Sequence, residues 1–239
     1  AFFIDQLWPK FLATTPSKCL EPSTVTGPFF PLHFFNCDNV TTPIPMVALQ
    51  YHKVELRVRS GGDVGTSADT FKFYGNYIML DTEERKWFAE NEHQLLITQT
   101  QRINADANGS DLAYLNHPVK GLFWGQEVQD TLQTSNVQLH LNGTAVFNNN
   151  LPAKYFNTVS MYQHSENAVP GVAITSDKAK YMYSFATGVN KHQPTGTCNF
   201  SRLDNAKLAW TTGLTGTPTY LYGVNYNILR VKDGLGGVM

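Results

Sequence analysis

The residues that could carry out chemistry in this 239-residue chain are scattered along it. A cupin-like enzyme would need histidines and a carboxylate at short, fixed spacing on one strand, where they could hold a metal ion. No two histidines have the spacing of an HxH or HExxH motif, so the sequence predicts no metal site and no cofactor. The seven histidines are His33, His52, His93, His117, His140, His164 and His192.

Nucleophilic and carboxylate catalysis are disfavoured as well. Ser201 is not part of a GxSxG motif and has no activating base nearby in the sequence, although a triad assembles in space rather than along the chain. Asp81, Glu83 and Glu84 are better explained as a helix start, in which Asp81 and Glu84 form a capping box. The glycines within 234–237 follow a strand but open no helix, unlike a dinucleotide-binding loop. The sequence therefore predicts no catalytic residue and no enzymatic activity.

The composition favours strands joined by long turns. Charged residues make up 15% of the chain, below the usual ~25%, and aromatic residues make up 13%. The formal net charge is -1 and the basic residues are scattered, so direct nucleic-acid binding is not expected. No apolar run approaches the ~20 residues that span a bilayer, and the N-terminus does not have the pattern of a signal peptide.

The three cysteines, Cys19, Cys37 and Cys198, are odd in number and widely spaced, so no disulfide framework is expected. We expect reduced and buried thiols, as in a protein that assembles in the cytoplasm. Four glycosylation sequons matter only if the protein enters a secretory route, and they begin at Asn39, Asn108, Asn142 and Asn199.

Alternating apolar residues predict strands on both sides of a flexible stretch. Residues 47–51 and 54–58 each alternate, but the two sets are out of phase. Keeping both on one buried face requires an extra residue, which predicts a β-bulge near His52; the alternative is a strand that changes the sheet it faces. Residues 61–68 are small and flexible and form the best linker. Residues 71–80 are apolar on both faces, which predicts a central strand.

From residue 69 onward, the pattern predicts seven or eight strands with two short helices between them. Asn142-Gly143 predicts a type I′ hairpin turn, and Pro152 predicts the first turn of a helix over 153–161. Such a set of strands suits an eight-stranded jelly roll with two facing sheets about 10 Å apart. The strands expected after residue 80 include 93–103, 119–124, 137–141, 181–185 and an apolar face along 220–228.

Aromatic side chains leave one binding function open, because jelly rolls include lectins and an exposed aromatic groove could bind sugar. The candidates are Trp8, Trp87, Trp124 and Trp210. Each is expected in the core instead, because folding tends to bury the large apolar area of tryptophan.

The stretch HQPTGTCNFSRLD at residues 192–204 is the one around which the chain is organised. Pro194 fixes φ and Gly196 tolerates positive φ, so the two predict a turn. A strand is expected to follow, with Arg202 and Asp204 on one face and close enough to interact. On physical grounds alone, this is a surface turn that leads into a strand.

This stretch, together with YLYGVNYNILRVKDGLGG at 220–237, closely resembles the major capsid proteins of nucleocytoplasmic large DNA viruses of the iridovirus, phycodnavirus and asfarvirus kind. Residues 31–58 are similar to the final strands of the first jelly roll of that family. Residues 77–101 resemble the opening strand and helix of the second jelly roll, and residues 141–165 resemble its middle hairpin and helix. Residues 187–190 depart from the charged segment that usually precedes the HQP turn.

The resemblance implies an all-β subunit with two jelly-roll β-sandwiches and short inserted helices. Residues 1–60 would be the last strands of the first jelly roll, 61–68 a linker, and 69–239 the complete second jelly roll. The strands of 1–60 would lack sheet partners, so we expect the rest of the subunit as a separate chain or an N-terminal half. The family-motif residues expected to be structural are His192, Gln193, Pro194, Gly196, Cys198, Asn199, Phe200, Ser201, Arg202, Asp204, Asn225, Tyr226, Asn227 and Arg230.

The same resemblance implies a structural role. Three copies would form a trimeric, pseudo-hexagonal capsomer, and capsomers would tile the icosahedral capsid of a large DNA virus. The expected partners are further copies, neighbouring capsomers and minor capsid proteins, with no direct nucleic acid and no membrane span; an internal viral membrane beneath the shell is compatible with this. The expected location is the virion capsid, assembled in the host cytoplasm. The second choice of function is a carbohydrate-binding jelly-roll module, and the third is a cupin-like enzyme.

Overall fold

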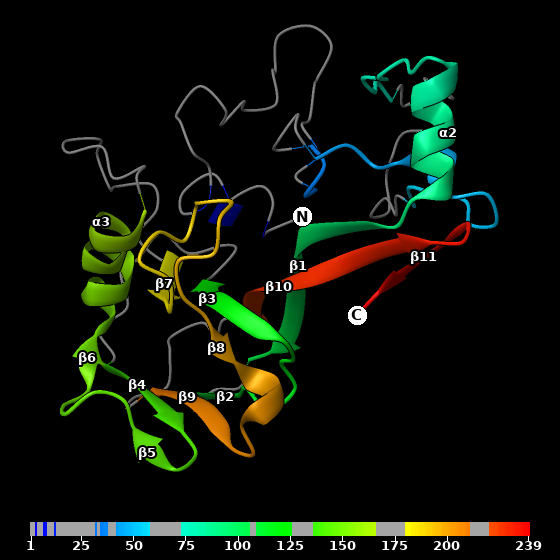
Figure 1. Ribbon diagram of the computed structural model, residues 1–239. Helices are drawn as coiled ribbons and strands as arrows, with labels where there is room; N and C mark the ends of the chain where they lie inside the picture. Colours follow the sequence, from blue (N-terminus) through cyan, green and yellow to red (C-terminus); the bar gives the residue numbers. More distant parts are fainter. Residues whose placement is uncertain are drawn as a thin grey trace, which may run out of the picture. The chain divides into compact units, whose positions relative to one another are not determined.

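The computed structural model describes residues 3, 7, 8, 12, 32, 34–37, 42–57, 73–105, 109–125, 136–165, 180–210 and 220–239. The chain divides into two compact units, which are treated separately below. Unit 1 comprises Ala1–Asp38 and Ile97–Asn227, and unit 2 comprises Asn39–Leu96 and Ile228–Met239. Most of the regular structure is antiparallel β, with a few short helices (Figure 1).

Two antiparallel sheets account for the strands, which confirms the expected all-β class. The first sheet has the order β1 (His93–Asn104), β10 (Tyr220–Lys232), β3 (Pro118–Gly125) and β7 (Lys180–Ser184). In addition, β11 (Leu235–Val238) pairs with β10, and β8 (Cys198–Asn199) pairs with β3. The second sheet has the order β2 (Gly109–Asp111), β9 (Ala206–Trp210), β4 (Asn136–Leu141) and β5 (Thr144–Ala145), and β6 (Leu151–Pro152) pairs with β4.

The core of unit 1 lies between the two sheets. Side chains alternate along each strand, so every second residue of a strand faces the other sheet. Leu122 and Trp124 of β3 share one buried cluster with Leu139 of β4 and with Leu208 and Trp210 of β9. Leu122, Leu139 and Leu208 are fully buried. Burying each such leucine stabilises the fold by about 1.5–3 kcal/mol.

The opposite face of the first sheet is buried as well. Phe123, Met182 and Tyr222 are neighbours across β7, β3 and β10. The ring of Phe3 covers this row, with its centroid 5.1 Å from that of Tyr222 and 6.1 Å from that of Phe123. Leu7 belongs to the same cluster and is fully buried. β3 is therefore buried on both faces, as a central strand is.

The local signals in the sequence are confirmed. α2 (Thr82–Glu90) begins with the expected capping box: the Asp81 carboxylate accepts hydrogen bonds from the amides of Glu83 and Glu84, and the Glu84 side chain accepts one from the Asp81 amide. Asn142 and Gly143 have φ of 48° and 78°, as a type I′ turn between β4 and β5 requires.

The helix predicted after Pro152 is present, but it is irregular. Residues 153–154 are α-helical, η4 (Tyr155–Val159) is a π-helical turn, and α3 (Ser160–His164) continues it. Pro152 itself ends β6, so it precedes the helix instead of occupying its first turn. The described residues also contain two 3₁₀ turns, η3 (Met46–Ala48) and η5 (Phe200–Arg202).

Two predicted strands are wrong. Residues 49–57 contain no strand, so the predicted β-bulge near His52 has no ladder to interrupt; residue 58 lies outside the described residues. Residues 73–80 are irregular and almost all exposed, so they are not a central strand, and residues 71 and 72 lie outside the described residues. In both cases the apolar pattern is that of a strand, but no described segment pairs with it.

Three further expectations of burial differ from the structure. Trp87 is 56% exposed, because α2 buries none of its residues, whereas Trp124 and Trp210 lie in the core as expected. Trp8 is half-buried. Cys37 is exposed and Cys198 is partly buried, and both are free thiols.

Several expectations concern residues outside those described: the linker at 61–68, Cys19, His33 and the sequons at Asn39 and Asn108. Within the described part of the chain, no helix is long and apolar enough to cross a bilayer.

Candidate functional site

The turn at residues 192–197 is fastened by a threonine and a glycine. The Thr195 hydroxyl accepts a hydrogen bond from the Gly188 amide at 3.0 Å and donates one to the Gly188 carbonyl at 3.1 Å. Gly196 has φ of +147°, and a Cβ built there would lie 2.7 Å from the Phe185 carbonyl oxygen. Any other residue at 196 would force the turn away from the segment that follows β7.

The segment after the turn pairs briefly with β3 and then coils. Cys198 pairs with Val119 and Asn199 with Pro118. The Asn199 side chain then accepts a hydrogen bond from the Ser201 amide at 3.1 Å and caps η5. The prediction of a continuing strand here is wrong, because this local side-chain bond competes with a ladder and turns the chain.

Phe200 and Ser201 attach the turn to residue 117. The His117 amide donates to the Ser201 hydroxyl at 2.8 Å, and the Phe200 amide donates to the His117 carbonyl at 3.2 Å. The Phe200 ring is 2% exposed and lies 5.8 Å from the Phe185 ring. The Ser201 hydroxyl therefore accepts a hydrogen bond from the backbone, and this structural role accounts for a serine at this position.

Arg202 and Asp204 do not form the predicted ion pair. The 3₁₀ turn removes the alternation on which that prediction depended, and both side chains are exposed. The Asp204 amide instead donates to the Asn142 side chain at 3.2 Å, and the Asn142 amide donates to the Asn205 carbonyl at 2.6 Å. The hairpin tip at Asn142 is thereby tied to the end of the 192–204 stretch.

A ladder of side-chain amides lies where β10 neighbours β1. Asn225 is fully buried and lies at an irregularity in the pairing of β10 with β3. The Gln101 side chain donates to Asn225 Oδ1 at 2.9 Å, and the Asn227 side chain donates to Gln99 Oε1 at 3.1 Å. The Asn116 amide also donates to Gln101 Oε1, at 3.0 Å. These bonds satisfy polar groups that would otherwise be costly to bury.

Tyr226 contacts the residue directly before the 192–204 stretch. Its hydroxyl donates to the Lys191 carbonyl at 3.4 Å, and the Lys120 ammonium lies 5.4 Å from the centre of its ring. Burial raises the pKa of Tyr226 above its ordinary value, so the phenol stays neutral and able to donate. Burial likewise raises the pKa of the Cys198 thiol, which makes it a poor nucleophile.

Arg230, in unit 2, holds Glu92 in a two-point ion pair. Its Nε and Nη2 donate to the two carboxylate oxygens of Glu92 at 2.7 and 3.0 Å. The Gln94 side chain donates to the same carboxylate, and the Lys232 ammonium lies 3.9 Å from it. The hydrogen bond from Arg230, followed by that from Gln94, lowers the pKa of Glu92 to about 2.

Two of the described histidines, His52 and His93, form side-chain hydrogen bonds to the backbone. His93 bonds the Phe88 carbonyl at 2.8 Å, and His52 accepts from the Gly236 amide at 3.0 Å. Across the described ranges, no three His, Cys, Asp or Glu side chains gather as metal ligands would. Sequence reasoning identified Asn225 but missed its partners Gln99 and Gln101, and it missed the bond between Asn142 and the Asp204 amide. The two glutamines at i and i+2 on one strand face were the available signal.

The sequence comparisons point to viral capsid proteins. Residues 126–237 match the family model for the large eukaryotic DNA virus major capsid protein. The major capsid protein of Pyramimonas orientalis virus is 36% identical over 258 residues, which cover 94% of this chain and 65% of that protein. The major capsid protein of Paramecium bursaria Chlorella virus 1 is 27% identical over 294 residues, covering 88% of this chain and 65% of that protein.

Solved structures agree with the sequence matches. The crystal structure of PBCV-1 VP54, fitted into a reconstruction of the virophage Sputnik, has a TM-score of 0.66 at 25% identity, covering 87% of this chain and 68% of that chain. A quasi-atomic model of the PBCV-1 virus capsid has a TM-score of 0.66 at 27% identity, covering 87% and 69%. These neighbours are double jelly-roll proteins, which confirms the predicted fold, and nothing among them supports the lectin alternative.

The chain spans about 65% of the length of the first relatives, a partial coverage that fits their C-terminal portion. Sequence and fold therefore agree in making this chain similar to the major capsid proteins of large eukaryotic DNA viruses.

Proposed function

We propose that this chain is part of a structural capsid subunit whose copies assemble as trimeric, pseudo-hexagonal capsomers that tile an icosahedral shell. The observation that carries the proposal is the joint likeness, in sequence and in fold, to the PBCV-1 capsid subunit. Closed symmetry would place the same patches against each other in every copy, and contacts of this obligate kind commonly bury more than about 2,000 Å².

The motif residues support a structural role in this proposal. Gly196, Asn199 and Ser201 shape or fasten backbone within unit 1, and Asn225 accepts a hydrogen bond from the Gln101 side chain. None of these contacts forms a nucleophile–base pair. The motif therefore holds loops in fixed positions, because a subunit that packs against identical copies needs a constant surface. In this proposal the protein has a structural role and no catalytic one.

The proposal also assigns location and partners. The subunit resides in the virion capsid and assembles in the host cytoplasm, where the free thiols Cys37 and Cys198 stay reduced. Its partners are further copies, neighbouring capsomers and minor capsid proteins, without direct contact to nucleic acid. Residues 1–60 belong to the first jelly roll and 69–239 to the second.

Arg202→Ala tests the assembly role of the 192–204 stretch. The Arg202 side chain is exposed and has no ion pair among the described residues, so its removal leaves the fold intact. If Arg202 anchors a neighbouring copy, its truncation weakens association by about 2 kcal/mol, or about 30-fold. The measurement is capsomer yield of the complete subunit by size exclusion, with the melting temperature measured in parallel.

Lys207→Ala is the matched control, because Lys207 is also an exposed cation of unit 1 but lies outside the stretch. The prediction is that both variants melt like the wild type and only Arg202→Ala loses capsomers. Equal capsomer yields for the wild type and Arg202→Ala would show that this arginine has no part in assembly.

A further inference from the structure

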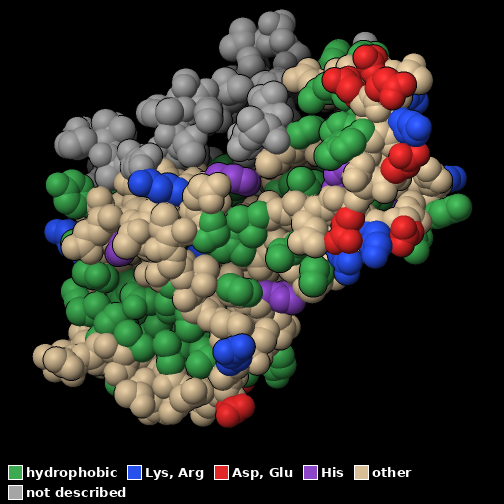
Figure 2. Space-filling view, in the orientation of Figure 1, with side chains coloured by type: hydrophobic (Ala, Val, Ile, Leu, Met, Phe, Trp, Pro, Cys, Tyr) green, Lys and Arg blue, Asp and Glu red, His purple; other side chains and the backbone are tan. Residues whose placement is uncertain are grey.

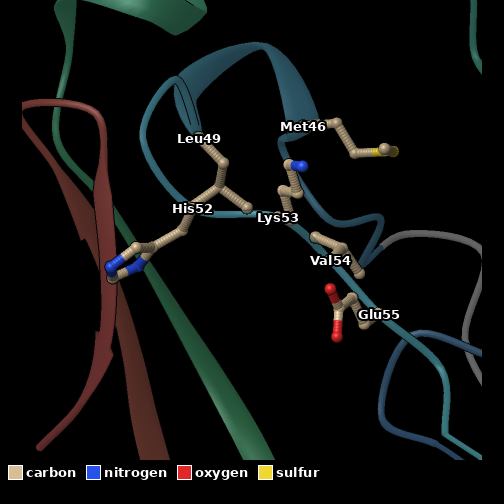
Figure 3. A pocket seen from close by; sticks show the side chains of 6 residues that line it. All are labelled: Met46, Leu49, His52, Lys53, Val54 and Glu55. Carbon is tan, nitrogen blue, oxygen red and sulfur yellow. The ribbon is translucent and has the colours of Figure 1, made fainter.

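Polar side chains at the surface carry little information about how strands pair. Figure 2 shows charged side chains at the surface of the region that holds α2, where water can replace a partner that is lost. A pocket in unit 2 has a polar side formed by His52, Lys53 and Glu55, and all three residues are exposed (Figure 3). Such groups are satisfied in many arrangements, whereas a buried polar group is satisfied only where a partner faces it.

The side-chain amides that join β1 to β10 include a buried group of this kind. Asn225 is fully buried, and it both accepts and donates. Its Oδ1 accepts a hydrogen bond from the Gln101 side chain at 2.9 Å, and its Nδ2 donates to Gln99 Oε1 at 3.4 Å. The Asn227 side chain donates to the same Gln99 oxygen at 3.1 Å. Two amides of each strand therefore form one network, and all four residues belong to unit 1.

This network lies in the middle of an otherwise apolar pattern. Gln101 contacts Asn225 and Gln99 contacts Asn227, so amide meets amide on two neighbouring antiparallel strands (Figure 1). Side chains two residues apart point to the same side of a strand. At that spacing the pattern continues on β1 with Leu95, Ile97 and Ile103, and on β10 with Leu221, Gly223, Leu229 and Val231.

The apolar pattern alone leaves the register of these two strands open. A slip by one residue would turn every side chain to the other face, but a slip by two residues keeps the faces. The alternate positions of β10 do not distinguish such a slip, because they are apolar throughout: Tyr220, Tyr222, Val224, Tyr226 and Ile228. The amides interrupt the apolar repeat, and they therefore make one register different from the next.

A slip by two residues separates these amides in either direction. One direction would place Asn225 opposite Ile103, and the other would place Asn227 opposite Ile97. Ile97 and Ile103 are 4% and 8% exposed, so an amide that faces either of them loses its partner and gains little water. A buried amide without a partner disfavours the slipped pairing by roughly 10- to 100-fold.

We propose that Gln99, Gln101, Asn225 and Asn227 select the register of β1 against β10 from the registers that the apolar pattern allows equally. Their role is selection and not added stability, because replacing both partners of a buried hydrogen bond by apolar groups of similar size can be nearly neutral. Gln101 gives the network a fixed point, since its side chain donates to the Asn116 carbonyl at 2.7 Å and accepts from the Asn116 amide at 3.0 Å. This proposal does not depend on the capsid function.

The first test removes all four amides at once. The combined variant Gln99→Leu, Gln101→Leu, Asn225→Leu and Asn227→Leu makes the pattern on both strands uniformly apolar. Nuclear Overhauser contacts between backbone protons then report which positions of β1 and β10 lie opposite each other. The wild type should show position 101 opposite 225 in every molecule. In the variant, at least about a tenth of the molecules should show 101 opposite 227 or 99 opposite 225, because a preference of 10-fold or more is lost.

The second test moves the amide pair of β1 and keeps the composition of its face. Ile97→Gln combined with Gln101→Ile places the two glutamines at positions 97 and 99. A slip by two residues would then bring them opposite Asn227 and Asn225, so this variant should show position 99 opposite 225 in place of 101 opposite 225.

Gln138→Leu combined with Asn150→Leu is the matched control. It removes another hydrogen-bonded amide pair of unit 1, joined at 3.3 Å, and the two-residue turn at Asn142 and Gly143 already fixes the register of β4 against β5. The control should keep the wild-type contacts between β1 and β10.

Three results would overturn the proposal. One is a purely native register in either the leucine variant or the shifted variant. Another is loss of the folded state in either of them, because the amides would then supply stability instead of selection. The third is a slipped register in the control, because the register of β1 would then respond to the loss of any amide pair.

Discussion

At the scale of single residues, polar side chains near the 192–204 stretch act on the backbone. Asn142, Asn199 and Ser201 each accept hydrogen bonds from main-chain amides, and Asn225 joins a ladder of amides. The identity of most of these residues could be predicted from the motif. Their partners could not, because His117 and Gln101 are distant in sequence and nothing local specifies such a contact.

Glu92 makes stability depend on pH in a defined direction. Its folded-state pKa of about 2 lies below its ordinary value of 4.5, because it accepts hydrogen bonds from Arg230. Its contribution to stability is therefore complete above pH 4.5 and is lost as the pH falls through about 2. Both partners are partly exposed, so solvent and salt reduce this contribution.

The measurement is urea unfolding of the wild type and of Glu92→Gln at neutral pH and near pH 2. We predict that the variant is less stable at neutral pH and that the difference vanishes at the acidic end. Glu90→Gln is the control, since Glu90 has no ion pair among the described residues. The difference in unfolding free energy between this variant and the wild type should not depend on this ion pair at either pH. A difference between wild type and Glu92→Gln that stays constant with pH would contradict the role of the pair.

At the scale of elements, the sequence predicted helix caps and turns, but it did not predict which strands would pair. The capping box of α2 and the type I′ turn at Asn142 depend on neighbouring residues, and both were predicted correctly. The strands predicted over residues 54–58 and 71–80 are not strands in the described residues, because a strand exists only where another supplies its hydrogen bonds. Phe200–Arg202 became a 3₁₀ turn because the Asn199 side chain bonds the backbone there.

Asp81→Ala should loosen α2. The helix has nine residues and buries none of them, so its first turn depends on the two bonds that the Asp81 carboxylate accepts, at 2.9 and 3.2 Å. Loss of such a cap costs about 1 kcal/mol, and Asp81→Asn should retain it. Amide exchange within α2 measures the effect, and identical exchange in Asp81→Ala and Asp81→Asn would contradict it.

At the scale of the whole molecule, burial divides the chain into two kinds of unit. Unit 1 has a core between two sheets, and its first sheet is covered on the other face by Phe3 and Leu7. Unit 2 exposes most of the large apolar side chains among its described residues. The sequence indicated the jelly roll and the family, because alternation and motif are properties of the chain itself. The sequence could not indicate which apolar side chains would be exposed, because their burial depends on which strands pair with one another.

The central claim is that these sheets belong to a subunit built to assemble with its own copies. The most direct test is the mass of the complete subunit in solution, measured by size exclusion with light scattering. The account predicts a stable trimer that resists dilution, as obligate assemblies do. A complete, folded subunit that stays monomeric at every concentration examined would contradict the account.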